Sequence, residues 1–289
     1  MSALPPFPGP IWITGTGGLI GQSLVQSAPD HRPGDRVVGS RRADLDLTDG
    51  AAVRSEFQRL QPGLVIHCAA MTNTNQCAAE PRTAWRTNVE TTTLLAGLAE
   101  RIPFVFFSTD LVFDGKTGNY EESAEVNPLG VYGETKAAAE RAVLANPGHT
   151  VIRTSLNGGN SPSGDRAFNE QLRRAWQEGR VLPLFTDEIR CPIPATVTAR
   201  AVWELIGQNQ PGLYHVAGSE RLSRWQMGRV LAARWPQLQP NITAMSLQDY
   251  AGPPRSPDTS MICAKAQRLL SFPLPGLTQW LAENPDEVF

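Results

Sequence analysis

Residues 11–21 read IWITGTGGLIG, a short apolar run that enters a glycine-rich turn and continues into an amphipathic segment. The run has the composition of a buried parallel strand, and the segment after it has helical periodicity. Gly15, Gly18 and Gly21 recur at a spacing that suits a tight strand-to-helix turn with the helix packed closely on the strand. The feature therefore predicts a βα unit near the start of the chain.

The same alternation continues through the first half of the chain. Helical patterns lie near residues 19–28, 49–60, 76–100 and 133–145, and the strand candidates are Ile11–Thr14, Arg36–Gly39, Leu64–Cys68, Phe104–Ser108 and Thr150–Arg153. This order predicts an α/β fold, a Rossmann-type doubly wound parallel sheet with helices on both faces. Ligands of such sheets bind beyond the carboxyl ends of the strands.

The pattern changes after residue 155. A loop is expected over 157–164 and a helix over 166–178, and a helix near 196–207 and a strand at 213–216 are expected to return to the main domain. Residues 222–289 contain short helical segments separated by proline-rich turns. We therefore predict a dinucleotide-binding domain of 1–155 plus about 196–218. A small, discontinuous C-terminal substrate-binding lobe would comprise about 156–195 and 219–289.

Composition narrows the class of protein. The chain has 289 residues, 41% hydrophobic and 19% charged, with a formal net charge of −2. This balance is globular and argues against nucleic-acid and membrane partners. The four cysteines lack the spacing of a zinc site, so we expect no metal and a reducing, cytoplasmic location. We see no signal peptide or membrane span and expect a monomer or a homodimer.

The glycine turn is a candidate phosphate cradle. Gly15 would allow the turn, Gly18 would let the backbone approach a pyrophosphate, and Gly21 would bring the helix close to the strand. Free N–H groups at the start of the helix favour an anion there. The alternative is a glycine-rich turn without a ligand. The downstream tyrosine and lysine favour a dinucleotide.

The tip of the second strand bears on the choice of cofactor. Arg41 and Arg42 stand where proteins that bind NADH usually carry an acidic residue for the ribose, and guanidinium groups suit a 2′-phosphate. We therefore predict NADPH. NADH remains the alternative, because Asp44 could reach a ribose, and the arginines could be a solvated basic pair.

Tyr132 and Lys136 are four residues apart, a spacing that places them on one face of a helix. A hydroxyl at the end of the apolar run 104–108 can meet them there, either Thr109 or Ser108, which point to opposite faces. Tyr132 would donate a proton to a carbonyl oxygen, Thr109 would orient that oxygen, and Lys136 would lower the pKa of Tyr132. These parts suit hydride transfer to a carbonyl compound.

At these residues the chain resembles the extended short-chain dehydrogenase/reductases, and most of all their dTDP-4-dehydrorhamnose reductase branch. The resemblance is carried by STDLVFDG at 108–115, YGETK at 132–136, AAMT at 69–72, DLT at 46–48 and GLYHVAG at 212–218. Asp187-Glu188 and Pro194-Ala195 resemble a further stretch of the branch. The likeness covers nearly the whole chain, strongly to residue 155 and loosely after it.

The resemblance implies a reductase of a nucleotide-linked 4-keto-6-deoxy sugar, with Thr109, Tyr132 and Lys136 as the catalytic triad. It places Asp110 near the sugar. The cofactor would lie on Gly15, Gly18, Leu19, Ile20, Gly21, Arg41, Arg42, Asp46, Leu47, Ala69, Ala70 and Thr72, together with Tyr132 and Lys136.

The chain departs from the family pattern in the substrate pocket. Leu111 replaces a tyrosine, Leu156 replaces a sugar-stacking tryptophan, and the C-terminal motif is altered over 255–262. The triad is intact, so we expect retained redox chemistry on an altered carbonyl substrate. Arg190 and Arg255 are the candidate contacts to a diphosphate.

Two alternatives remain open. One is an epimerase or dehydratase of the same fold, although Asp110-Leu111 offers a single carboxylate where a dehydratase usually has an additional acid–base pair. The other is a non-catalytic, NADP-binding regulatory subunit, which the altered pocket favours and the intact triad opposes. His67 is expected to be a packed core histidine, and Asn88 a structural residue.

Overall fold

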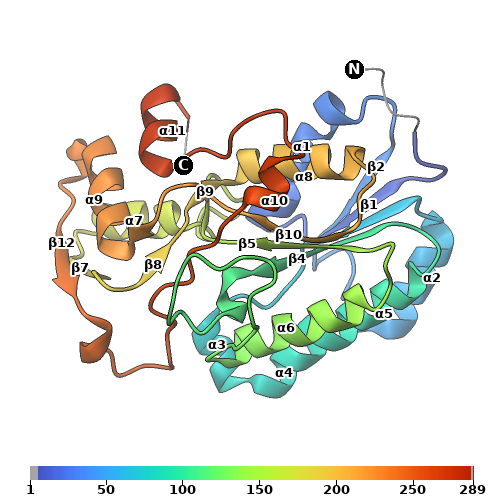
Figure 1. Ribbon diagram of the computed structural model, residues 1–289, viewed down its shortest axis with the longest axis horizontal. Coiled ribbons are helices and arrows are strands. Elements are labelled where there is room, and N and C mark those ends of the chain that lie inside the picture. Colours follow the sequence, from blue (N-terminus) through green and yellow to red (C-terminus); the bar gives the residue numbers. More distant parts are fainter. Residues whose placement is uncertain (1–5, 288) are drawn as a thin grey trace.

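The computed structural model describes residues 6–287 and 289. Its central sheet has six parallel strands in the order β10-β5-β4-β3-β1-β2 (Figure 1). The strands are β1 (Ile11–Thr14), β2 (Val37–Ser40), β3 (Leu64–His67), β4 (Phe104–Thr109), β5 (Thr150–Thr154) and β10 (Gly212–Val216). All six predicted strands are confirmed, with ends that differ by one residue at most.

Helices cover both faces of the sheet, as predicted (Figure 1). One face carries α1 (Leu19–His31), α8 (Ala195–Gly207) and α10 (Ala264–Gln267). The other face carries α2 (Gly50–Leu60), α5 (Thr91–Leu98) and α6 (Val131–Leu144). Strand β1 shows why both faces are needed: Ile11 and Ile13 belong to one apolar cluster and Trp12 to the other. A strand that is buried on both faces is therefore apolar at consecutive positions and not at alternate ones.

The single helix predicted over 76–100 is wrong. The segment forms α3 (Thr74–Ala79), α4 (Pro81–Trp85), a π-helical turn η1 (Arg86–Glu90) and then α5. Pro81 lacks an N–H group and so begins a new helix instead of continuing α3. The π-helical turn has no distinct sequence pattern, and such turns are frequent near functional sites.

The strand order fixes the position of the ligand crevice. From β1 the chain passes to β2 on one side, whereas β3 lies on the other, so the order reverses between β1 and β3. A crevice opens at the carboxyl ends of strands at such a point. Gly15 lies there with a φ of 79°, and a Cβ atom on it would stand 2.5 Å from the Ala69 amide nitrogen after β3. Glycine is therefore required by the approach of the two strand ends.

The lobe lies beside the carboxyl end of the sheet (Figure 1). Its helices are α7 (Phe168–Gln177), α9 (Arg224–Arg234) and α11 (Leu277–Glu283), which share an apolar cluster that includes Trp176, Leu231 and Trp280. Short strands complete it: β6 (Asn157–Gly158), β7 (Leu182–Phe185), β8 (Ile189–Arg190), β9 (Ile193–Pro194), β11 (Leu222–Ser223) and β12 (Ile242–Met245). The predicted loop 157–164 thus begins with a strand, β6, that pairs with β9. None of the helices in the described part of the chain has the length and hydropathy of a membrane span.

Candidate active site

The three triad residues meet where β4 ends and α6 begins. Thr109 is the last residue of β4, and Tyr132 and Lys136 lie in the first turns of α6. The Tyr132 hydroxyl is hydrogen-bonded to the Thr109 side chain. The end of β4 and the start of α6 therefore contact each other through the side chains that are predicted to be catalytic.

The structure distinguishes the two candidate hydroxyls. Besides its bond to Tyr132, Thr109 Oγ1 donates to Asp110 Oδ1 (3.1 Å) and accepts from the Leu111 amide (3.2 Å). Ser108 points to the other face of β4, as strand alternation requires, and its buried Oγ has no hydrogen-bond partner within the described residues. Thr109 is thus the hydroxyl beside Tyr132.

Lys136 is buried beside the strands, with 2% of its surface exposed. Its Nζ lies 3.9 Å from the centroid of the Phe106 ring, and no hydrogen bond to the ammonium is found in residues 6–287 and 289. Burial lowers the pKa of Lys136 to about 7, although Glu140 and Cys68 act in the opposite direction. A buried ammonium with free donors suits a neutral, hydroxyl-bearing ligand such as a ribose.

The expected effect of Lys136 on Tyr132 is wrong for the ligand-free protein. Burial raises the pKa of Tyr132, the Asp110 carboxylate raises it further, and the hydrogen bond to Thr109 only partly opposes them. Burial disfavours the charged form of both partners, so it favours a phenol and an uncharged amine together. The free site therefore holds Tyr132 in the proton-donating form.

Asn88 supports the site from behind. Its side chain accepts from the Met71 amide (2.8 Å) and donates to the Thr135 hydroxyl (3.0 Å), and Thr135 in turn donates to the Tyr132 carbonyl (2.8 Å). The π-helical turn η1 carries this side chain. Asn88 has the structural role that was predicted, because it ties the segment after β3 to the first turn of α6.

His67 is not a catalytic base. It is fully buried in β3, between the hydroxyl groups of Thr14 (2.7 Å) and Thr92 (3.1 Å). Burial lowers the pKa of His67 to about 3, so the ring stays neutral. The prediction of a packed core histidine is confirmed.

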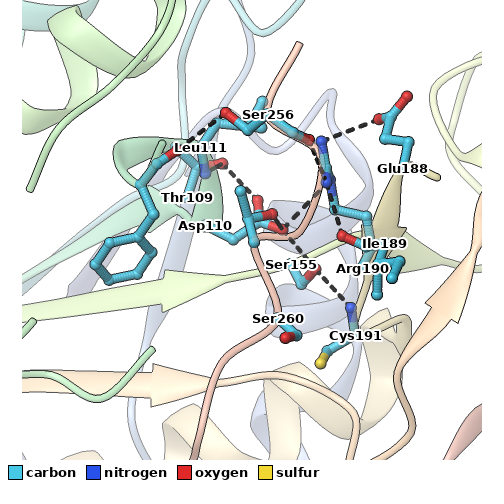
Figure 2. A network of polar contacts seen from close by, with 12 residues as sticks. Thr109, Asp110, Leu111, Ser155, Glu188, Ile189, Arg190, Cys191, Ser256 and Ser260 are labelled. Atoms are coloured by element: carbon cyan, nitrogen blue, oxygen red, sulfur yellow. Dashed lines mark hydrogen bonds and ion pairs between the residues drawn. The ribbon is translucent and has the colours of Figure 1, made fainter. Parts of the chain in front are cut away.

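Asp110 lies inside a polar network (Figure 2). Only 4% of its surface is exposed. Its Oδ2 accepts from Ser155 Oγ (2.7 Å) and Thr259 Oγ1 (2.9 Å) and lies 3.7 Å from Arg190 Nε. These contacts all lie within the chain, and the place of Asp110 beside a sugar stays a prediction.

The predicted diphosphate contact of Arg190 is not supported by its position. The residue is 3% exposed, and its guanidinium donates to Glu188 (3.0 Å) and to the Ile189 and Ser256 carbonyls (Figure 2). These partners and Asp110 occupy its donors. Its sequence signal was charge alone, which does not distinguish a ligand contact from an internal one.

Glu188 is the shared ion-pair partner of three arginines. The carboxylate is fully buried and is paired with Arg190, Arg224 and Arg255. Burial would raise the pKa of Glu188, but the three guanidinium groups outweigh it and lower the pKa to about 2. The Arg255 side chain keeps 25% of its surface exposed, so of the two predicted contacts it is the one still open to a ligand.

The glycine turn has the features of a phosphate cradle. Gly18 caps α1 without a side-chain hydrogen bond, so the amides of Leu19 and Ile20 have no intrahelical acceptor. Leu19 turns its side chain inward, where it packs with Ala167 and Ala195. A Cβ on Gly21 would stand 2.6 Å from the Gly15 carbonyl oxygen, so the helix requires glycine there. The residues present fit a pyrophosphate.

The basic tip after β2 is exposed and lies beside the cradle. A Cβ on Gly17 would lie 3.7 Å from Arg41 Cγ, and the Arg41 side chain is 64% exposed. Arg41 forms a two-pronged contact with Asp44 (3.0 and 3.2 Å), and Arg42 is also exposed. Asp46 accepts from both the amide and the hydroxyl of Thr48. The contact with Asp44 uses Nε and Nη2 of Arg41, so its other donors are open to a phosphate.

The remaining predicted positions lie around this crevice. Ala69 and Ala70 are partly buried beyond β3, Thr72 is exposed, and Leu47 is partly buried against the α2–α5 side of the core. Leu111 is partly buried, and Leu156 packs against the apolar cluster of the lobe. Sequence reasoning missed Ser155 and Thr259. Ser155 directly follows β5, so the strand-end rule could have found it, whereas Thr259 has no local signal.

A parallel sheet with a glycine-rich turn after β1, and a Thr–Tyr–Lys site at the end of β4, defines an oxidoreductase of the extended short-chain dehydrogenase/reductase class. The model of the RmlD substrate binding domain family matches residues 9–288. The chain belongs to this family.

Curated relatives cover most of the chain. A dTDP-4-dehydrorhamnose reductase of Streptomyces griseus is 38% identical over 74% of this chain and 72% of its own length. The probable low-salt glycan biosynthesis reductase Agl14 of Haloferax volcanii is 32% identical over 75% of this chain and 77% of its own length. The methionine adenosyltransferase 2 subunit beta of Danio rerio is 25% identical over 90% of this chain and 84% of its own length.

Solved structures show the same fold. A hypothetical dTDP-4-dehydrorhamnose reductase from Sulfolobus tokodaii superimposes with a TM-score of 0.83 at 27% identity, covering 93% of this chain and 97% of that one. The dTDP-4-dehydrorhamnose reductase of Bacillus anthracis, solved in complex with NADP, gives a TM-score of 0.87 at 22% identity, covering 95% and 98%.

Proposed function

We propose that the chain is an NADPH-dependent reductase of a nucleotide-linked 4-keto-6-deoxy sugar. The observation that carries the proposal is the hydrogen-bonded pair of Thr109 and Tyr132, with Lys136 on the same helix, at the strand end beside the glycine turn. Reductases of the family among its relatives support the substrate class. NADH is the alternative cofactor, because Arg41 is held by Asp44 in the free chain.

Each residue of the site then has a defined task. NADPH, when bound, supplies the hydride. Tyr132 donates its phenol proton to the carbonyl oxygen, and Thr109 lies beside it to orient that oxygen. Lys136 binds ribose hydroxyls, and the amides at the start of α1 receive the pyrophosphate. The exposed edge of Arg255 is the candidate contact to the diphosphate of the substrate.

We propose the domain division that the sequence predicts, with 1–155 and about 196–218 binding the dinucleotide. The position of β10 in the central sheet and of α8 beside α1 supports it. The four cysteines are free, two of them buried and two partly buried, which supports a reducing cytoplasm. We keep both a monomer and a homodimer as the oligomeric state.

The test is a reductase assay with dTDP-4-dehydrorhamnose as the substrate and with NADPH and NADH in parallel. The proposal expects NADPH to be consumed in stoichiometric amounts. An epimerase would change the sugar without net consumption, and a dehydratase would release a product that has lost water. Either result would overturn the proposal.

A regulatory subunit is the second candidate. The match to a methionine adenosyltransferase subunit favours it, as does the loss of two aromatic positions at Leu111 and Leu156. This candidate expects NADPH binding without turnover of any keto sugar. Calorimetric binding of NADPH combined with an inactive assay would support it against the reductase.

A further inference from the structure

The π-helical turn η1 lies between the two ends of the cofactor crevice. In the proposed enzyme the dinucleotide reaches from the tip of β2, which meets the adenosine ribose, to the end of β4, where the triad meets the nicotinamide. The strands β1 and β3 lie between β2 and β4 in the sheet. η1 leads into α5, on the face of the sheet that also carries α2 and α6. Its residues contact segments at both ends of the crevice.

The middle of η1 is tied to the nicotinamide end. Asn88 accepts from the Met71 amide (2.8 Å), and its Nδ2 contacts the Met71 carbonyl (3.1 Å) and the Thr135 hydroxyl (3.0 Å). Thr92 donates to the Asn88 carbonyl (2.7 Å). These bonds fix the position of η1 relative to the first turns of α6.

The two ends of η1 are tied to the segment 46–48 instead. Arg86 begins the turn, and Thr91 directly follows it. Arg86 Nη2 donates to the Thr48 carbonyl (3.0 Å), and Thr91 Oγ1 donates to the Leu47 carbonyl (3.1 Å). Residues 46–48 belong to neither a helix nor a strand. The position of this segment therefore depends on such side-chain contacts.

The segment 46–48 presents an oriented carboxylate beside the tip of β2. Asp46 Oδ1 accepts from both the amide (2.9 Å) and the hydroxyl (2.8 Å) of Thr48. Both bonds use the same oxygen, so Oδ2 is open to a donor such as the amino group of an adenine. Thr48 is also the residue whose carbonyl Arg86 holds. The orientation of Asp46 is thus linked to Arg86 through Thr48.

We propose that Arg86 and Thr91 are positioning residues for the adenosine half of the cofactor, because they hold the segment 46–48 against η1. The inference rests on the proposed function, since it needs a dinucleotide in this crevice. It gives Arg86 a different task from that of the arginines at the tip of β2, which bind the 2′-phosphate. Adenosine is common to NADPH and NADH, so the loss of Arg86 should weaken the binding of both cofactors alike.

Arg86→Met tests this inference, because it removes the donor to Thr48 and keeps most of the length of the side chain. Calorimetry should show the dissociation constants of NADPH, NADH and ADP-ribose, which is NADH without its nicotinamide, rising by one common factor of about tenfold. Turnover at saturating cofactor should be retained. Arg86→Lys keeps a donor for the Thr48 carbonyl and should recover most of the affinity. Arg82→Met, at an exposed arginine of α4, is the control and should change none of the constants.

Thr91→Val removes the second contact while keeping the volume of the side chain. It should weaken the binding of the same three ligands. Thr92→Val is its matched control, since Thr92 is the next residue, is also buried, and donates to the Asn88 carbonyl and not to the segment 46–48. A merely structural role would make the two variants alike, with similar losses of melting temperature and the same affinity for ADP-ribose. That result would overturn the proposal.

The binding data also separate this inference from the proposed function. Unchanged constants in Arg86→Met would overturn the inference. A loss confined to NADPH would also overturn it, because Arg86 would then be a direct contact of the 2′-phosphate. A parent chain that shows the expected pattern of binding but reduces no keto sugar would overturn only the reductase function. A parent chain that binds neither dinucleotide would overturn both.

Discussion

Gly133 and Leu111 approach so closely that a Cβ atom on Gly133 would stand 2.2 Å from the Leu111 carbonyl oxygen. This contact sets the distance between the first turn of α6 and the short helix η2 (Asp110–Val112), which follows Thr109. Tyr132 is the neighbour of Gly133, so the same contact places its hydroxyl beside Thr109. The glycine after the tyrosine is thus part of how the site is built.

Gly133→Ala should reduce turnover more than it reduces stability. The new methyl group meets backbone, which cannot rotate away, and α6 must shift. A misplacement of about 1 Å can cost roughly 10²-fold in rate, and overpacking costs about 1–3 kcal/mol. Steady-state kinetics and urea unfolding would measure the two effects.

Gly97→Ala is the matched control for this experiment. Gly97 lies in α5, and a Cβ there would have no neighbour within 4 Å. The change should raise helix stability by up to about 1 kcal/mol and leave kcat unchanged. Unaltered kinetics in Gly133→Ala would show that the spacing of α6 and η2 does not govern the site.

Tyr132→Phe should abolish turnover and leave NADPH affinity nearly unchanged. Loss of a general acid costs about 10²–10⁴-fold, whereas the ring itself keeps its packing. Single-turnover rates and a fluorescence titration with NADPH would separate the two. Tyr214→Phe, which loses one hydrogen bond to the Gln210 carbonyl, should keep its activity. Reduction at the parental rate by Tyr132→Phe would remove Tyr132 from the mechanism.

Lys136→Met should stabilise the protein at neutral and acidic pH while inactivating it. Burial lowers the pKa of Lys136 to about 7 from 10.5, so the unfolded chain binds the proton more tightly. The stability penalty is complete below pH 7 and disappears as the pH rises toward about 10.5. Its full size is several kcal/mol, on the order of 1.4 kcal/mol for each unit.

Urea unfolding of Lys136→Met and the parent at a series of pH values checks this prediction. The gain in unfolding free energy should be largest below pH 7 and should shrink above it. Lys116→Met is the control, because Lys116 is 75% exposed and should show little effect at any pH. A gain that does not depend on pH would mean that the substitution acts through packing alone.

Much of the fold follows from the sequence because buried parallel strands form nearly continuous apolar runs. The strands β1, β3 and β4 show this, and the strand-end rule then places Thr109 and the glycine turn. Tyr132 and Lys136 were predictable from helical spacing. The break at Pro81 was visible in the sequence, but the adjoining π-helical turn was not, because it depends on the contacts of Asn88.

The positions of the charged side chains in the lobe were the least predictable feature of the candidate site. Arg190 and Arg255 have the same side chain, yet one is held inside the protein by Glu188 and Asp110 and the other reaches the surface. That difference depends on tertiary contacts between segments far apart in the sequence. The pKa of Tyr132 was predicted in the wrong direction for the same reason, since burial and Asp110 outweigh the spacing of Tyr132 and Lys136.

Replacing both Arg41 and Arg42 by Ala should weaken NADPH binding far more than NADH binding. The two side chains are exposed at the tip after β2, where only the 2′-phosphate distinguishes the cofactors. Asp44→Ala should act in the opposite direction, because it releases the Arg41 guanidinium from its carboxylate partner. Dissociation constants for both cofactors would measure the change. Arg59→Ala, which removes an exposed arginine paired with Glu56 on α2, should alter neither constant. Equal losses of NADPH and NADH affinity in the double variant would mean that these arginines do not bind the 2′-phosphate.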